Sequence, residues 1–152
     1  MSHYFATVTW KKKTSEDFVD NKYSRAHQWK FDGGTVVEAS SSPQVVPLPY
    51  SSEASVDPEE AFIASLSSCH MLFFLSFAAN RKYTVESYID EATGIMQIDE
   101  NKRMSMTDVT LYPKILFSGD KQPTQEQIDK IHHNAHKQCF IANSVKTKIH
   151  IK

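Results

Sequence analysis

The chain has 152 residues, of which 40% are hydrophobic and 23% charged, so we expect a folded globular protein rather than a disordered one. Its net charge of −1 lacks the clustered basic excess typical of proteins that bind nucleic acid. The length fits a single domain over residues 1–152. The first residues show no signal sequence, so we expect a cytoplasmic protein, in which two cysteines seldom form a structural disulfide.

The first third of the chain predicts strands and a long loop. Residues 4–10 are β-branched and aromatic, which favours a strand. Residues 27–31 and 35–39 have the same character and are joined by an Asp-Gly-Gly turn, which predicts a hairpin because glycine adopts positive φ. Residues 40–56 are rich in serine and proline and show no periodicity. A loop this long in a compact domain often belongs to a functional site.

A long helix follows, and its first turn is marked clearly. Asp57 is a candidate N-cap, Pro58 suits the first helical position, and Glu60 completes a capping box. Residues 61–79 carry no formal charge, and a membrane span needs about 20 apolar residues. The four serines, the cysteine and the histidine in this stretch favour instead a buried central helix, ending near Asn80, that is covered on every side. We therefore expect no membrane partner.

The second half predicts two strand-like segments, a helix and a last strand. Residues 84–98 and 105–117 are strand-like, and Pro113 in the second segment indicates an edge or a bulge. Residues 144–151 alternate between apolar and polar side chains, as a half-buried strand does. The expected element order is β-β-β-α-β-β-α-β, which is an α+β fold.

The second helix is predicted to begin after Thr124, which forms a capping box with Gln127. Its apolar residues fall on one stripe, so the helix should bury one face and carry its cysteine inward. The stripe consists of Ile128, Ile131, Ala135 and Cys139.

The two cysteines, Cys69 and Cys139, leave two interpretations open when only their spacing is considered. If the two helices cross, the sulfurs can meet, and a thiolate at Cys69 would attack a peroxide and then condense with Cys139. Free cysteines are also among the most buried residues and often only fill space. A nucleophilic Cys69 in the middle of an apolar helix needs a cation from another part of the fold.

A resemblance to a known family bears on this choice. Residues 57–69 resemble the start of the central helix in OsmC/Ohr proteins, whose usual form is Asn-Pro-Glu with the peroxidatic cysteine ten residues after the glutamate. Glu59 and Cys69 have that separation. Residues 135–139 are similar to the family's resolving-cysteine segment, and Arg25 lies ahead of the hairpin, where the family places its catalytic arginine.

The resemblance implies an OsmC-like fold in an intertwined homodimer, with two active sites at the subunit interface. It implies a thiol-dependent peroxidase that reduces organic hydroperoxides in oxidative-stress defence, with a dithiol reductant and no cofactor. Cys69 would be the nucleophile and Cys139 the resolving thiol. Arg25 would stabilise the thiolate and the departing oxygen, and Glu59 would hold Arg25. The chain departs from the family pattern after each cysteine, where His70 replaces an aromatic residue and Phe140 replaces proline.

The helix geometry adds an expectation about the dimer. Ten helical residues rise about 15 Å, so one arginine can hardly reach Glu59 and Cys69 of the same helix. We therefore expect Glu59 and Arg25 to meet Cys69 of the partner subunit.

The remaining candidates concern a substrate pocket. The aromatic residues of the central helix are first of all core, but some can also favour bulky hydroperoxides. His70 points about 100° away from Cys69 on the helix, so we interpret it as a packing residue or a hydrogen-bond donor behind the nucleophile rather than the base. The other histidines of the second helix are expected to form a mixed polar face. The candidate pocket residues are His27, Tyr50, Phe62, Phe73 and His70.

Two alternatives come from other classes of protein. A non-catalytic binding protein would use the interfacial pocket for an apolar ligand. A metal protein would combine His136 and Cys139, three apart on one helix face, with Cys69 as a third zinc ligand. No tight metal-binding pattern is present in the sequence, so we expect no metal.

Overall fold

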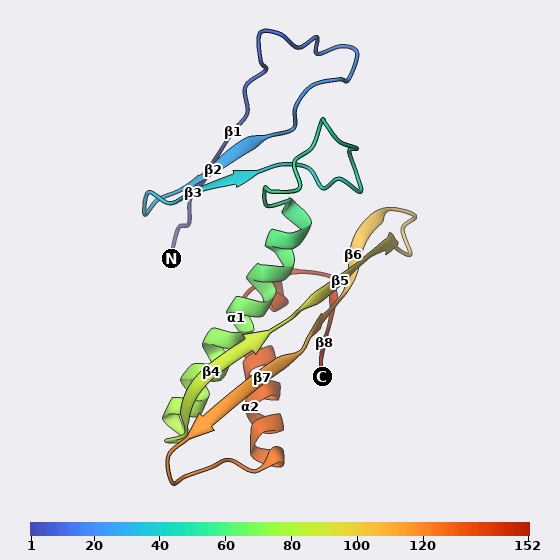
Figure 1. The fold of residues 1–152 in the computed structure, drawn as a ribbon. Helices are drawn as coiled ribbons and strands as arrows, with labels where there is room; N and C mark the ends of the chain where they lie inside the picture. Colours follow the sequence, from blue (N-terminus) through green and yellow to red (C-terminus); the bar gives the residue numbers. More distant parts are fainter. The chain divides into compact units, whose positions relative to one another are not determined.

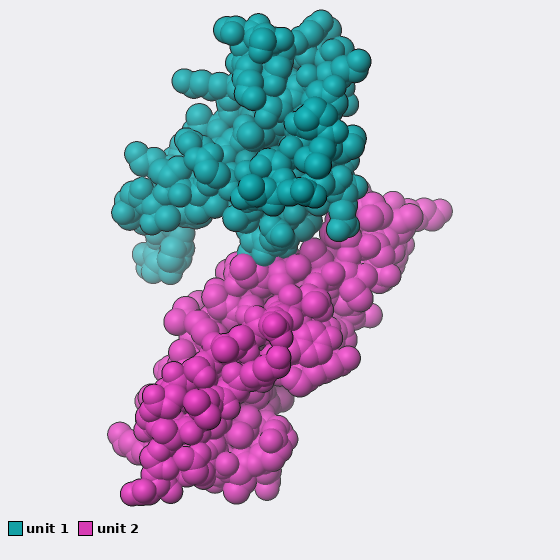
Figure 2. Space-filling model, in the orientation of Figure 1, with its two compact units in different colours: residues 1–61 teal, residues 62–152 magenta.

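The computed structural model describes all residues, 1–152, as two compact units. Figure 2 shows unit 1, Met1–Ala61, in teal and unit 2, Phe62–Lys152, in magenta. Each unit is described by itself below.

Unit 1 is built on a small antiparallel sheet in the order β1-β2-β3 (Figure 1). The strands are β1 (Ala6–Thr9), β2 (His27–Phe31) and β3 (Val36–Ala39). The predicted hairpin between β2 and β3 is confirmed, and Gly34 in its turn has a φ of +88°, which glycine adopts without a steric penalty. The serine- and proline-rich loop returns to the end of β3, where the Ser40 N–H donates to the Val56 carbonyl at 3.0 Å.

The long helix α1 spans Pro58–Asn80, as predicted. Its capping box is formed in both directions: the Asp57 carboxylate accepts from the Glu60 N–H at 2.7 Å, and the Glu60 carboxylate accepts from the Asp57 N–H at 3.3 Å. These two bonds satisfy N–H groups that no helical carbonyl can reach, so they fix where the helix begins.

Unit 2 contains two further sheets (Figure 1). One pairs β4 (Thr84–Asp90) with β7 (Pro113–Ser118), and the other has the order β5-β6-β8, in which β6 and β8 are parallel. Its strands are β5 (Thr93–Ile98), β6 (Met104–Leu111) and β8 (Lys148–Ile151).

Eight strands are present in all, because each of the two long strand-like segments of the sequence divides into two. The expected order, which had six strands, was wrong in this number, while the α+β class is confirmed. The second break falls at Tyr112, directly before Pro113, whose missing N–H cannot continue a ladder of backbone hydrogen bonds. The last strand, β8, begins only at Lys148 instead of residue 144, and Ser144 belongs to a 3-10 helix, η1 (Ala142–Ser144).

Helix α2 (Gln125–Gln138) begins with the predicted capping box between Thr124 and Gln127. It packs with α1, β4 and β7 around one buried cluster, and a second cluster joins α1 to β6. The fully buried residues of the first cluster are Phe74, Ala78, Tyr83, Ile131 and Ala135. Those of the second are Leu66, Val109 and Leu111.

One stripe of α1 connects the two clusters. Leu66, His70, Phe74 and Ala78, each four residues after the last, are the buried residues of this helix. His70 is the polar member and lies between the two clusters along the helix. The positions of the core residues therefore place a histidine in the middle of the buried stripe.

The other faces of α1 are less covered than the sequence predicted. Leu72 keeps 62% of its surface exposed, so a single chain does not cover the helix on every side. By length and composition α1 is the one helix that could span a membrane, but its buried stripe belongs to the core of unit 2. These features fit a core helix that needs further cover on its remaining faces.

Candidate functional site

The structure brings the two predicted cysteines together in unit 2. Cys69 lies on α1 and is half-buried, whereas Cys139 is the C-cap residue of α2 and only 1% exposed. Burial, with a contribution from the adjacent Cys69 thiol, raises the pKa of Cys139 to about 11, although the Ala142 N–H donates to its Sγ at 3.4 Å. Both cysteines are free. One thiol is thus accessible and its neighbour is buried and protonated.

The position of Cys139 follows from the apolar stripe of α2, which the sequence predicted. The helix ends just before Cys139, and the next residue, Phe140, turns outward with 69% of its surface exposed. Its ring packs edge-on against Phe73 of α1, with 5.0 Å between the ring centroids. Phe62 packs against the cluster of Leu66. Phe73 and Phe140 therefore give the outer surface beside Cys139 an apolar character.

His70 makes a contact that the sequence did not predict. It is 1% exposed, and its Nε2 lies 3.0 Å from Nδ1 of His132, with the two rings nearly parallel at a centroid distance of 5.3 Å. Burial lowers the pKa of His70 to about 4, with smaller contributions from His132 and His136. His70 is consequently neutral at pH 7. Of the three histidines expected to form a mixed polar face, only His133 is exposed; His136 is half-buried, and His132 is half-buried and bound to His70 of α1.

Further polar residues of β4 and α1 surround this pair. Asp90 accepts hydrogen bonds from the Ser67 hydroxyl and from the Tyr112 N–H. Burial lowers the pKa of His132, and the carboxylates of Asp129 and Asp90 oppose that shift. Sequence reasoning missed these residues. Of these residues, only His132 could have been found from the sequence, because it lies seven residues before Cys139 and therefore on the same face of α2.

Three predicted site residues meet in unit 1. The Arg25 N–H donates to the Tyr50 carbonyl at 2.8 Å, and Nδ1 of His27 lies 2.8 Å from the Arg25 carbonyl. Nε2 of His27 accepts from the Trp29 indole at 2.9 Å, so His27 is the neutral tautomer with its proton on Nδ1. The contacts of His27 and Tyr50 fix the backbone of Arg25.

The side chain of Arg25 is held within its own loop. Its guanidinium donates to the carbonyl of Asn21 at 3.0 Å, to the side-chain oxygen of Asn21 at 2.7 Å and to the Tyr23 carbonyl. It also lies 3.8 Å from the centre of the Tyr23 ring. Glu59 is half-buried and makes no side-chain hydrogen bond or ion pair, so the expected pairing of Glu59 with Arg25 is not formed within one chain.

The zinc interpretation is not supported by the geometry. No group of three or more His, Cys, Asp or Glu side chains is placed to hold a metal ion. His136, Cys139 and Cys69 therefore do not form the ligand set that the spacing allowed.

The family model described as OsmC-like protein matches residues 51–152. The chain therefore belongs to the OsmC-like family, and this match contains both cysteines. No curated protein matches the chain.

Solved structures agree over the whole length. An OsmC-like protein of unknown function from Vibrio cholerae is 57% identical, with a TM-score of 0.99 and coverage of 100% of this chain and 99% of that one. An organic hydroperoxide resistance protein from Elizabethkingia anophelis is 19% identical, with a TM-score of 0.71 and coverage of 100% and 94%. The organic hydroperoxide resistance protein OhrB of Bacillus subtilis is 18% identical, with a TM-score of 0.65 and coverage of 97% and 98%. The last two share the fold.

We predict that the two thiols differ strongly in reactivity. Cys69 is accessible, whereas Cys139 is buried and its raised pKa keeps it protonated up to about pH 11. Iodoacetamide at pH 8, followed by peptide mass spectrometry, should label Cys69 first. In a Cys69→Ser variant Cys139 should still react slowly, and equal labelling of both cysteines in the native protein would contradict the assignment.

We also predict that the buried His70 makes the protein sensitive to acid. Its pKa is lower in the folded state than in the unfolded state, so the unfolded chain binds the extra proton between pH 6.5 and about 4. The free energy of unfolding should therefore fall as pH is lowered through this window, by about 3 kcal/mol for His70 alone.

Urea unfolding of the native protein and a His70→Gln variant at several pH values tests this prediction. Glutamine does not titrate, so the variant should lose this part of the pH dependence. His133→Gln, at an exposed position on helix α2, should keep the native slope. The same slope in all three proteins would contradict the prediction.

Proposed function

We propose that this protein is a thiol-dependent peroxidase that reduces organic hydroperoxides, in which Cys69 is the nucleophile and Cys139 the resolving thiol. The observation that carries the proposal is the adjacency of an accessible thiol and a buried one in unit 2. Membership of a family that includes organic hydroperoxide resistance proteins supports the same chemistry. Oxidative-stress defence in the cytoplasm is the corresponding role.

The chemistry balances without a cofactor. The Cys69 thiolate attacks one peroxide oxygen, so an S–O bond forms, the O–O bond breaks, and the leaving alkoxide takes up a proton. The resulting sulfenic acid is attacked by the Cys139 sulfur, which forms the disulfide and releases water. A dithiol reductant then restores both thiols by exchange.

The activating cation is assigned to the partner subunit. A Cys69 thiolate needs a nearby positive charge, and ten residues of helix separate Glu59 from Cys69 by about 15 Å. Arg25 and Glu59 of one protomer would therefore serve Cys69 of the partner subunit. The Glu59 side chain, which has no partner in its own chain, and the uncovered faces of α1 support a homodimer of this kind.

The surroundings of the thiols favour bulky apolar peroxides over hydrogen peroxide. Phe73 and Phe140 form an apolar surface next to Cys139. Phe62 lies on α1 seven residues before Cys69 and therefore on the same helix face. His70, which the sequence also suggested for the pocket, is only 1% exposed and faces the interior, so it does not line this surface. We assign the remaining wall to His27 and Tyr50, which flank Arg25 in unit 1. Burying the alkyl or aryl group of an organic hydroperoxide against an apolar wall stabilises the complex more than burying the second hydroxyl of hydrogen peroxide.

We predict that stoichiometric cumene hydroperoxide consumes two thiols per chain. The product should be a disulfide between Cys69 and Cys139, because the two sulfurs are adjacent in the reduced protein. Free-thiol counting and mass spectrometry of the digested protein measure this result.

Two variants separate the roles of the thiols. Cys69→Ser should abolish peroxide consumption, whereas Cys139→Ser should consume one equivalent and accumulate a sulfenic acid that dimedone traps. If both thiols of the native protein survive excess peroxide, the peroxidase proposal fails. Binding of an apolar ligand without catalysis would then be the better account.

We predict that two inactive variants restore activity when combined in one dimer. A hybrid of an Arg25→Met chain and a Cys69→Ser chain contains one complete site if Arg25 acts on Cys69 of the partner subunit. Purified through two different affinity tags, this hybrid should have about half the native activity per dimer. Each parent homodimer should be inactive. An inactive hybrid, with an active native protein carrying the same two tags, would place Arg25 and Cys69 of one chain in the same site.

A further inference from the structure

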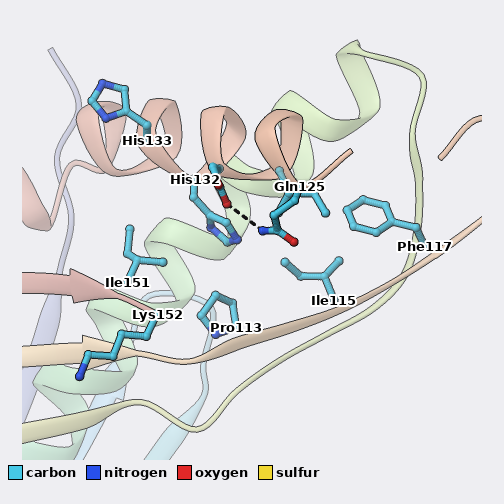
Figure 3. Close-up of a pocket in the computed structure, with 10 residues that line it drawn as sticks. Pro113, Ile115, Phe117, Gln125, His132, His133, Ile151 and Lys152 are labelled. Carbon is cyan, nitrogen blue, oxygen red and sulfur yellow. Dashed lines mark hydrogen bonds between the residues drawn. The ribbon is translucent and has the colours of Figure 1, made fainter. Parts of the chain in front are cut away.

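Two pockets of unit 2, each of about 440 Å³, differ in charge. The first lies between α2 and β7, where Ile115 and Phe117 form an apolar wall (Figure 3). On the α2 side, the carboxylate of Asp129 accepts a hydrogen bond from the side-chain amide of Gln125 at 2.8 Å. Lys152 lines the same pocket, so a negative and a positive side chain are both present. This pocket therefore favours neither sign of charge.

The second pocket lies where α1 ends and α2 begins, at the same end of unit 2 (Figure 1). No acidic side chain lines it, although the chain as a whole has a net charge of −1. None of its basic side chains forms an ion pair with a carboxylate. The pocket is lined by four basic residues, Arg81, Lys82, Lys121 and Lys130, together with Asn80, Gln127 and Tyr83.

The end of α1 holds two of these cations in place. Nη1 of Arg81 donates to the Phe77 carbonyl at 3.1 Å, and Nζ of Lys121 donates to the Arg81 carbonyl at 2.6 Å. Carbonyl groups at the end of a helix attract positive charge, so part of the cluster is explained by capping. An arginine side chain has five N–H donors and a lysine three, and each side chain uses one of them in these bonds. The remaining donors are available to a ligand.

The other two cations have no such role. Lys82 and Lys130 form no ion pair, and both are exposed. Lys82 follows the end of the helix with a φ of +63°, and its N–H donates to the Ala79 carbonyl at 2.9 Å. This position is usually glycine, which adopts a positive φ without steric cost. Capping of α1 therefore explains only half of the positive charge in the pocket.

We propose that this second pocket binds a small soluble ligand that contains two or more linked phosphoryl groups. A single phosphate carries about two negative charges at neutral pH, so four cations match a longer phosphoryl chain. The volume of about 440 Å³ lies within the usual range for small-molecule sites. The site shares no residue with the thiol site, so the proposal goes beyond the peroxidase and does not depend on it.

The chemistry of the lining residues assigns their parts in binding. The planar guanidinium of Arg81 can bind two phosphoryl oxygens at once, whereas the lysines act as point charges. The amides of Asn80 and Gln127 add neutral donors. Tyr83 offers no free ring face for a nucleobase, because it is only 7% exposed and the Lys121 ammonium lies 5.0 Å from its ring centre. Recognition therefore depends on the phosphoryl chain.

Isothermal titration calorimetry of the reduced, untagged protein with inorganic triphosphate tests the proposal. The buffer contains no Mg²⁺, which would neutralise the phosphoryl oxygens. We expect one site per chain with micromolar affinity that falls as the salt concentration rises, because added ions screen the charges. ATP should bind with similar affinity, since it carries the same phosphoryl chain, and adenosine should not bind.

Two variants remove the cations that capping does not explain. Lys82→Gly and Lys130→Gln should each weaken triphosphate binding about tenfold, which corresponds to the loss of one charge-assisted hydrogen bond. Neither change should lower thermal stability. Glycine suits the positive φ at position 82, and glutamine has nearly the helix propensity of lysine on α2. Weaker binding by these variants would therefore not result from unfolding.

The chain offers a matched control at Lys102. This exposed lysine lies between β5 and β6, outside the pocket, and has a φ of +61°. Lys102→Gly therefore removes the same charge from the same backbone conformation as Lys82→Gly. It should bind triphosphate as tightly as the native protein.

Three results would overturn the phosphoryl site: no saturable binding of triphosphate to the native protein at low salt, an equal loss of affinity in Lys102→Gly and Lys82→Gly, or binding of adenosine as tight as that of ATP. An equal loss would show that net charge alone attracts the anion. The titration involves no peroxide, and the loss of thiols with cumene hydroperoxide is measured separately. Failure of one proposal is thus distinguished from failure of the other.

Discussion

The buried stripe of α1 is the constraint on which the rest of the site depends. Leu66, Phe74 and Ala78 are each within 1% of full burial, so the rotation of the helix about its axis is fixed by the two clusters that they join. Cys69 lies one position away from this stripe and is therefore half-buried at its edge. The same rotation turns His70 fully inward. Packing of apolar side chains thus decides which residue of the Cys-His pair is accessible.

Helix α2 imposes the complementary constraint on the second thiol. Ile131 and Ala135 of its apolar stripe pack in the same cluster as Phe74. The helix ends at its C-cap residue Cys139, which lies next to Cys69. An accessible thiol beside a buried one suits a two-step reaction, because the first thiol meets the substrate and the second reacts only with the first. In this arrangement the buried thiol is only 1% exposed and has hardly any direct contact with water.

The family shows how much of this arrangement belongs to the fold and how much to the chain. Organic hydroperoxide resistance proteins that are 18% and 19% identical share the architecture over nearly the whole length, which shows the fold alone. The residues that follow each cysteine, His70 and Phe140, differ from the family pattern, and both take part in contacts next to the thiols. Two departures from the family pattern therefore lie next to the thiols.

The sequence by itself determined the features that depend on local spacing. Capping boxes at Asp57 and Thr124, the α+β class, the apolar stripe that carries Cys139 and the family resemblance were all predicted correctly, because they involve residues a few positions apart. Only the tertiary structure decided the hydrogen bond between His70 and His132, which are 62 residues apart, and the division of two long segments into four strands. Periodicity records which face of an element is apolar, but not which side chain of another element that face will meet. That choice depends on how the helices and sheets pack together.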